Sequence, residues 1–121
     1  MRILAAVLSW SGRALAVGCF AVWGMFFVEH LGWFMDPGRG LPPVRVWLLQ
    51  LAHLVLLAGL LVLLRWEIAG SIVTIAAALV FFAEVAGPRF LLFFGVTIVP
   101  VILVLLGRAL QYRLSWSSPG R

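Results

Sequence analysis

Apolar residues along this chain fall into four long runs separated by short polar segments. The second run is the least interrupted, because between Arg45 and Arg65 it carries no formal charge for 19 residues. As a helix this stretch is about 28 Å long at ~1.5 Å per residue, close to the ~30 Å hydrocarbon thickness of a bilayer. A helix that is apolar all round must be buried on every side. The run therefore predicts a transmembrane helix with an arginine at each end.

The other runs predict three more helices of the same kind. The segment from Ala14 to Val28 is about 22 Å long as a helix, too short to span alone, so the first helix extends beyond it by an amount that the pattern leaves open. We expect helices at about 3–30, 45–65, 67–86 and 89–112. The fold class is all-α, a four-helix transmembrane bundle running up-down-up-down, in one domain over 1–114 with a short polar tail at 115–121.

Polar or glycine-rich segments join the expected helices. Residues 29–44 contain the turn signal Asp36-Pro37-Gly38 and form the longest connection. The next turn is the tight helix hairpin Arg65-Trp66-Glu67, in which we expect Trp66 to anchor at the membrane interface and Arg65 to lie near Glu67. The last helix follows Gly87-Pro88-Arg89, which ends the third.

Small residues mark the expected packing faces. Gly70, Thr74 and Ala77 share one face of the third helix, which lets a neighbouring helix approach closely. Pro100 lies inside the fourth helix, where it removes a backbone donor and predicts a bend, and we expect the face that carries it to lie toward the bundle. Glu84 follows the small-residue face near its end.

Composition supports a membrane protein, since 64% of the 121 residues are hydrophobic and 11% are charged. Soluble domains are roughly 45–50% apolar and about 25% charged. All nine cations are arginines spread singly along the chain, a distribution that membrane topology explains better than nucleic-acid binding. The single Cys19 excludes an intrachain disulfide, and we interpret it as a small buried residue rather than a lipoprotein cleavage site.

Arginine placement predicts the orientation. With four spans, one side of the membrane receives both chain ends and the turn at 65–67, with six arginines, and the other receives three. The positive-inside rule then places both termini in the cytoplasm.

A few polar side chains lie within or near the apolar runs, all in the half of the bilayer away from the termini. They suggest a polar pocket that opens outward, with its candidate residues being Glu29, Gln50, His53, Glu84, Arg89 and Thr97. A carboxylate beside a histidine can relay protons or bind a cation. The same groups can equally serve as hydrogen bonds between helices, and Glu84 can pair with Arg89 outside the hydrocarbon. Both interpretations stay open.

Enzyme chemistry has little support in the sequence. Two histidines and four acids are scattered without metal-ligand spacing, so we expect no metal site and no cofactor. There is no GxSxG motif, no CxxC pair and no glycine-rich phosphate loop.

Three short motifs carry a resemblance: Glu29-His30, Arg65-Trp66-Glu67 followed by Gly70, and Gly87-Pro88-Arg89-Phe90. In these the chain resembles small bacterial four-helix membrane proteins grouped only as a domain of unknown function. The resemblance implies the fold and a location in the bacterial cytoplasmic (inner) membrane, and it implies no activity.

We therefore expect a non-enzymatic accessory or scaffold subunit. Its partners would be the lipid bilayer and either further copies of itself or a larger membrane complex, with no nucleic acid. The competing hypothesis is a small proton- or cation-coupled transporter or channel that uses the outward-facing pocket.

Overall fold

The computed structural model describes residues 1–117, and in that range the ordered elements are all helical. The long helices are α1 (Arg2–Met35), α2 (Val44–Leu63), α3 (Glu67–Val85) and α4 (Phe90–Trp116), with one-turn helices η1 (Pro37–Arg39) and η2 (Gly87–Arg89) before α2 and α4. The all-α, four-helix fold expected from the sequence is confirmed. Each long helix is long and apolar enough to cross a membrane, judged by its length and composition.

Two helices are longer than expected. α1 has 34 residues and continues to Met35 rather than ending near residue 30, which makes it about 51 Å long at ~1.5 Å per residue. Glu29 and His30 do not interrupt a helix, whereas Asp36-Pro37 does. α4 continues through Trp116 because no glycine or proline follows Gly107 before that point. The expected polar tail therefore starts later than residue 115, and its residues 118–121 lie outside the described range.

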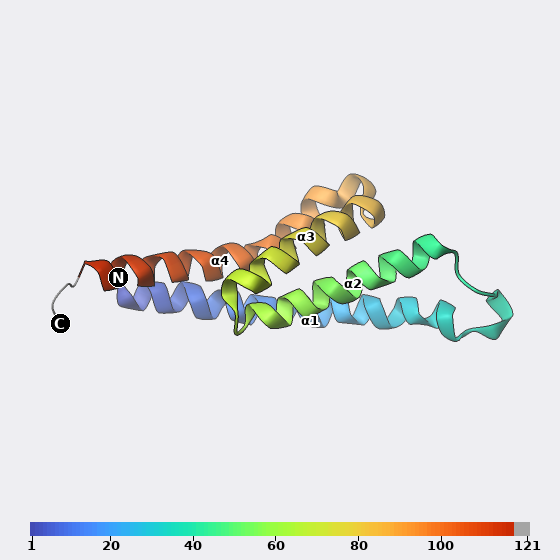
Figure 1. The fold of residues 1–121 in the computed structure, drawn as a ribbon, viewed down its shortest axis with the longest axis horizontal. Coiled ribbons are helices and arrows are strands. Elements are labelled where there is room, and N and C mark those ends of the chain that lie inside the picture. Colours follow the sequence, from blue (N-terminus) through green and yellow to red (C-terminus); the bar gives the residue numbers. More distant parts are fainter. Residues whose placement is uncertain (118–121) are drawn as a thin grey trace.

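The helices form two antiparallel pairs, because α1 packs chiefly on α4 and α2 packs chiefly on α3. Figure 1 shows the N-terminus and the end of α4 at one side of an elongated molecule and the α2–α3 turn farther in, toward the middle. We call this half of the molecule the terminal end. The α1–α2 loop and η2 lie toward the other side, the loop end, where the α3–α4 hairpin separates from the α1–α2 hairpin (Figure 1). The bundle is thus closed at the terminal end and splayed at the loop end.

Glycines explain the close packing toward the terminal end. A Cβ on Gly12 of α1 would lie 2.8 Å from the backbone nitrogen of Val104 in α4, and a Cβ on Gly107 would lie 2.8 Å from that of Ser9 in α1. α2 and α3 use the same device, with Gly59 against the Thr74 backbone and Gly70 against the Leu63 backbone. In each pair the two helix backbones touch where the side chain is missing.

Large aromatic residues occupy the space toward the loop end. Trp23 lies with its ring centroid 5.0 Å from that of Phe82 and 5.5 Å from that of Phe93, which joins α1, α3 and α4. Phe81 is buried beside Phe82. Aromatic rings hold helix axes farther apart than glycines do, so the same four helices diverge in this direction.

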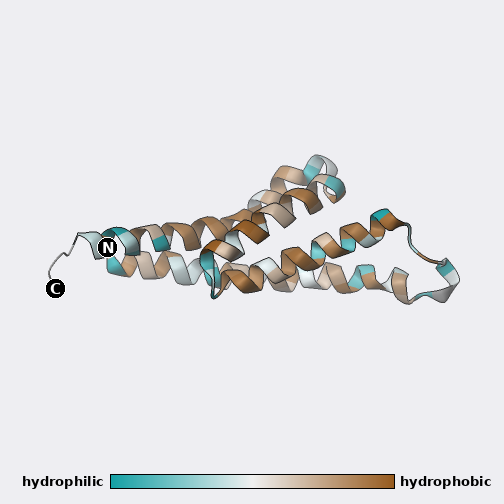
Figure 2. Cartoon of the chain, viewed as in Figure 1, coloured by the Kyte–Doolittle hydropathy of each residue, from teal (hydrophilic) through white to brown (hydrophobic). Residues whose placement is uncertain are grey.

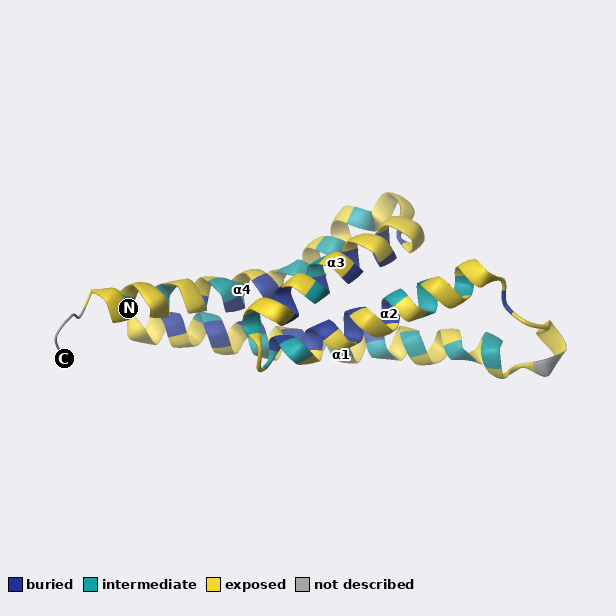
Figure 3. Cartoon of the chain, in the orientation of Figure 1, coloured by how far each residue is buried: buried dark blue, intermediate teal, exposed yellow. Residues whose placement is uncertain are grey.

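Side chains follow this arrangement. Figure 2 shows hydrophobic residues along the helices and hydrophilic ones mainly at the turns and chain ends. Figure 3 shows the buried residues on the faces that the helices turn toward one another, with exposed residues outside. The residues expected to pack between helices, Gly70, Thr74, Ala77 and Pro100, are all buried. Much of the exposed surface is apolar, as a lipid-facing surface must be.

Pro100 leaves one carbonyl of α4 without its usual partner, because proline has no N–H to donate to Val96. Cys19 of α1 donates its thiol to that Val96 carbonyl oxygen, with 3.8 Å between sulfur and oxygen. A thiol is a weak donor, so the contact compensates only in part. Cys19, expected from the sequence as a small buried residue, is half-buried and also makes this polar contact.

Gly12 and Gly18 provide a matched test of the glycine packing in α1. We expect Gly12→Ala to lower the free energy of unfolding by about 1–3 kcal/mol, because its Cβ would lie 2.6 Å from a Val104 side-chain methyl and 2.8 Å from the Val104 backbone nitrogen. The backbone atom cannot move aside unless α4 itself shifts. Gly18 has nothing within 4 Å of the corresponding position, so Gly18→Ala should leave stability unchanged or raise it by up to about 1 kcal/mol. Reversible unfolding in mixed micelles, followed by helical circular dichroism, measures both. Equal losses in the two variants would contradict the close-packing account.

Candidate functional site

His53 is the most deeply buried polar side chain of α2, with 1% of its surface exposed. Its Nε2 lies 2.8 Å from the carbonyl oxygen of Trp23 in α1. A carbonyl oxygen only accepts, so Nε2 must carry the proton and donate. In neutral His53 the other ring nitrogen, Nδ1, is therefore an acceptor, and no described residue donates a hydrogen bond to it.

Trp23 extends this contact to α4. Its indole Nε1 donates to the hydroxyl of Thr97 at 3.0 Å. Thr97, fully buried, donates in turn to the Phe93 carbonyl of its own helix at 2.8 Å. One tryptophan thus joins α2, α1 and α4 through groups that would otherwise be unsatisfied in an apolar interior.

A crevice lies on the loop-end side of His53, between the α1–α2 hairpin and the α3–α4 hairpin. It consists of a cavity of about 240 Å³ between α1, α2 and α3 and a cavity of about 170 Å³ that also reaches Phe93 of α4. The two cavities adjoin each other, because they share four lining residues, His30, His53, Phe81 and Val85. We call the two together the loop-end crevice. Its remaining walls are Trp33, Val46, Leu49 and Gln50 in the larger part and Trp23, Phe26, Phe82 and Phe93 in the smaller.

His30 stands at the exposed side of this crevice. Its Nδ1 lies 2.6 Å from the Phe26 carbonyl oxygen one turn earlier in α1, so this nitrogen donates and Nε2 is an acceptor in the neutral ring. The ring centroids of His30 and His53 are 6.4 Å apart. The crevice therefore has a histidine at its floor and another at its mouth.

The residues expected to form one outward pocket are only partly brought together. Gln50 and His53 line the loop-end crevice, and Thr97 lies behind its wall, bonded to Trp23. Gln50 donates to the Phe27 carbonyl at 3.4 Å, which is a contact between helices. Glu29, Glu84 and Arg89 are exposed and line neither part of the crevice.

Glu84 has a different partner from the one proposed from sequence. It accepts from Arg45 of α2 at 2.8 Å instead of pairing with Arg89, and both side chains are more than half exposed. Arg89 lies in η2, whose turn begins at Gly87 with a φ of 55° and directs the chain into α4. The antiparallel packing of α2 on α3 brings Arg45 and Glu84 to the same level at the loop end.

Glu29 lies in a separate groove on the side of α1. This lateral groove has a volume of about 620 Å³ and is open along much of its length. Its other lining residues are Phe20, Ala21, Gly24, Met25, Phe27, Val28 and Leu57. Within residues 1–117, Glu29 forms no ion pair or side-chain hydrogen bond.

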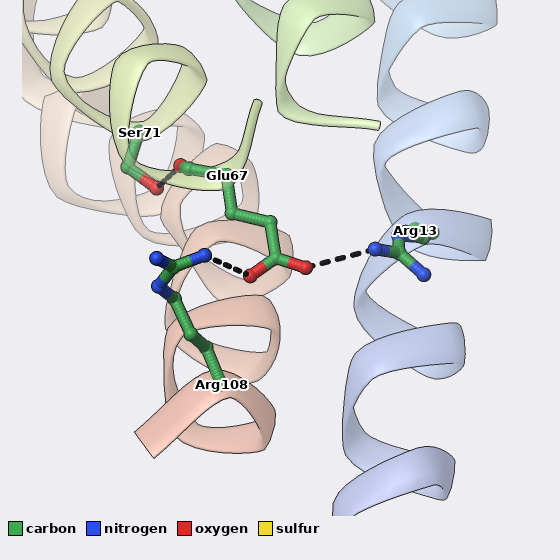
Figure 4. A network of polar contacts seen from close by, with 4 residues as sticks. All are labelled: Arg13, Glu67, Ser71 and Arg108. Carbon is green, nitrogen blue, oxygen red and sulfur yellow. Dashed lines mark hydrogen bonds and ion pairs between the residues drawn. The ribbon is translucent and has the colours of Figure 1, made fainter. Parts of the chain in front are cut away.

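Glu67 forms the main ionic cluster, at the terminal end. Its carboxylate binds Arg13 of α1 at 2.8 Å and Arg108 of α4 at 3.4 Å, while its backbone carbonyl accepts from Ser71. Figure 4 shows the two arginines approaching Glu67 from opposite sides. Only 11% of the Glu67 side chain and 26% of the Arg13 side chain are exposed.

Glu67 therefore does not form the local bridge to Arg65 that the sequence had left open. Arg65 and Trp66 are exposed, and the Glu67 carboxylate is occupied by two other helices. Arg65 sits in the turn before α3, whereas Glu67 starts α3 and is directed into the bundle. Arg65 and Trp66 connect α2 to α3, whereas the Glu67 side chain links α3 to α1 and α4.

Sequence reasoning missed Trp23, Trp33 and Phe81 as site residues and missed the roles of Arg13 and Arg108. Tryptophan in an apolar run gives no signal of its own, because its indole N–H becomes informative only when a partner is seen. Arg13 did give a signal, since it interrupts the apolar pattern of the first helix. Glu67, at the start of α3, was an acid that could pair with this arginine.

The described residues contain no group of three or more histidine, cysteine, aspartate or glutamate side chains that could hold a metal ion. No protein-family model, curated protein or solved structure matches this chain. A function for this chain therefore has to be inferred from the arrangement of its own residues.

Glu67 and Glu84 provide a matched comparison of the two ionic sites. We expect Glu67→Gln to lower the free energy of unfolding by about 1–3 kcal/mol, because it leaves two arginines at the junction without their counter-charge. Glu84→Gln removes an exposed pair and should cost about 0–1 kcal/mol. Unfolding in mixed micelles measures both variants. A larger loss for Glu84→Gln would show that the loop-end pair is the more important one.

Proposed function

We propose that this chain is a multi-pass membrane protein with a non-enzymatic accessory or scaffold role, and that it associates with another membrane protein or a second copy through the lateral groove of α1. The proposal has three parts, which are its place in the membrane, its orientation and its contact surface. Each rests on a different observation.

Two ionic sites, one near each end of α3, support the proposal that the chain spans a membrane. The Glu67 cluster lies at the terminal end and the Arg45–Glu84 pair lies at the loop end. Glu67 and Glu84 are 17 residues apart in one helix, which is about 25 Å at ~1.5 Å per residue and close to the ~30 Å of a bilayer core. The exposed side chains of α3 between them are apolar, including Ile72, Leu79 and Val80.

Arginine placement supports an orientation with the terminal end in the cytoplasm of a bacterial inner membrane. Among the described residues the terminal end carries Arg2, Arg13, Arg65, Arg108 and Arg113, whereas the loop end carries Arg39, Arg45 and Arg89. Cytoplasmic segments are enriched in arginine and lysine.

Reporter fusions test this orientation. We expect green fluorescent protein fused after residue 121 to fluoresce and alkaline phosphatase at the same place to be inactive, because both report a cytoplasmic end. Alkaline phosphatase inserted in the α1–α2 loop should be active. The opposite pattern would contradict the orientation.

Glu29 is the observation that favours lateral association. It lies 16 residues after Arg13 on α1, about 24 Å along the helix, and it borders an apolar groove without a partner in the described chain. An ionisable side chain in contact with lipid is costly, by about 2.5–3.5 kcal/mol at the bilayer centre and less toward the edge. A neighbouring helix that brings a donor or a cation removes this cost. Ala21 and Gly24 in the groove let such a helix approach closely.

Transport by the loop-end crevice has weaker support. The crevice gives His53 a route toward the loop end, which is the one observation in its favour. Below His53 the fully buried side chains toward Glu67 are mainly aliphatic, including Leu56, Leu60 and Leu63. Gly59 and Gly70 bring α2 and α3 into backbone contact there. A proton or cation crossing this region would have few polar groups to bind.

Site-specific photo-cross-linking tests the association. A photoreactive amino acid at Met25, in the lateral groove, should give one discrete protein adduct in native membranes, because the groove is occupied by a partner helix. The same amino acid at Ile72, exposed on α3, should give lipid adducts only. Glu29→Leu should reduce the Met25 adduct at least fivefold, since the partner loses its polar contact.

Two results would contradict the proposal. One is lipid adducts alone at both positions. The other is proton or cation flux into liposomes that contain the purified chain and that Glu84→Gln or His53→Ala abolishes, which would favour transport instead.

A further inference from the structure

The loop-end crevice has the size and walls of a site for a flat ring. Its two adjoining parts measure about 240 and 170 Å³, and an apolar cavity of about 150 Å³ already binds benzene. Phe26, Phe81, Phe82 and Phe93 surround the smaller part, and aromatic walls stack well on flat rings. A whole two-chain phospholipid is too large for this space, whereas one ring with its substituents fits it.

His53 supplies a fixed hydrogen-bond acceptor at the floor. Because its Nε2 donates to the Trp23 carbonyl, its Nδ1 is unprotonated in the neutral ring. The ring is held between Phe27 and Phe81, with centroids 5.3 and 4.5 Å away. His53 lines both parts of the crevice although only 1% of its surface is exposed. An acceptor fixed in this way favours a ligand that carries a hydroxyl hydrogen.

Trp33 supplies an unused donor in the larger part. Its indole Nε1 is buried and has no hydrogen-bond partner among residues 1–117. Arg39 stacks over the Trp33 ring, with its guanidinium carbon 5.0 Å from the ring centroid, which helps to hold the indole in place. A buried N–H without a partner costs about 1–3 kcal/mol. A small rotation of the indole, whose ring already lines the larger part, would bring this N–H to a ligand oxygen in the crevice and recover that loss.

From these groups we propose that the loop-end crevice binds the head ring of a lipid-soluble quinol. One ring hydroxyl donates to Nδ1 of His53, and an oxygen on another side of the ring accepts from Nε1 of Trp33. The ring stacks among the phenylalanines, and its apolar tail extends into the surrounding lipid. This inference is independent of the lateral groove on α1, which uses other residues.

The chemistry predicts a preference between the two redox forms of the same ligand. A quinone carries acceptors only, so it can bond to Trp33 but not to the lone pair on His53. A quinol has hydroxyl hydrogens and can bond to both. One hydrogen bond is worth about 0.5–1.5 kcal/mol, which is roughly a two- to twelvefold difference in affinity.

Calorimetric titration of the purified full chain in synthetic phospholipid nanodiscs tests the proposal, with empty nanodiscs as the reference for partition into lipid. The probes are decylubiquinol, decylubiquinone and the dimethyl ether of decylubiquinol, which keeps the ring and tail but has no hydroxyl hydrogen. We expect saturable binding near one quinol per chain. Decylubiquinone and the dimethyl ether should bind about two- to twelvefold more weakly.

Variants assign the two hydrogen bonds. His53→Phe keeps an aromatic ring at the floor and should abolish the preference for quinol over quinone. Trp33→Phe should weaken both forms about equally, since an oxygen of either can accept from the indole. Trp47→Phe is the matched control, because Trp47 packs on Phe34 outside the crevice and should leave both affinities within about twofold. Helical circular dichroism checks that each variant is folded. If His53→Phe fails to fold, the weaker binding of the dimethyl ether to the unaltered chain tests the bond to His53, and Trp33→Phe tests the bond to Trp33.

Three outcomes would overturn the proposal. The first is the absence of saturable binding. The second is equal binding of the three probes, which would make the crevice a general apolar cleft. The third is an unchanged quinol affinity in Trp33→Phe. None of these outcomes affects cross-linking at Met25, so failure here is distinguishable from failure of the proposed association.

Discussion

Backbone contact at four glycines is the constraint on which the rest of the structure depends. Gly12 and Gly107 bring α1 against α4, and Gly59 and Gly70 bring α2 against α3, all toward the terminal end. Toward the loop end, Gly18 and Gly95 have open space beside them and aromatic side chains separate the helices. Close contact in one direction and bulky rings in the other make the hairpins diverge, and this divergence creates the loop-end crevice.

Charge reinforces the same asymmetry. At the closed terminal end Glu67 joins α1, α3 and α4 with most of its surface buried, and its ion pair with Arg13 is less screened by solvent than its pair with the half-exposed Arg108. At the loop end the Arg45–Glu84 pair is exposed and joins only α2 and α3. The terminal end is therefore held by packing and by charge together, while the α1–α2 and α3–α4 hairpins are held apart at the loop end by rings alone.

The two candidate surfaces use different physical features. The lateral groove is open, lined by small and apolar residues of α1, and carries one unpaired carboxylate, which suits another helix. The loop-end crevice is narrower, lined by aromatic rings, and has a fixed acceptor and an unused donor, which suits a small ring-bearing molecule. Together the two proposals would place a lipid-soluble ligand close to a protein partner.

The sequence alone determined the number of helices, their approximate limits and the buried faces around Gly70 and Pro100, because long apolar runs and glycine or proline at their ends are local signals. The tertiary structure decided the partners. Glu67 and Glu84 each had a nearby arginine in sequence, yet they pair with arginines 54, 41 and 39 residues away, since helices in a bundle present side chains to their neighbours rather than to the adjacent turn. Only the path of the backbone could separate Glu29 from His53 and bring Trp23 to Thr97, because which helix faces which is a property of the packed bundle.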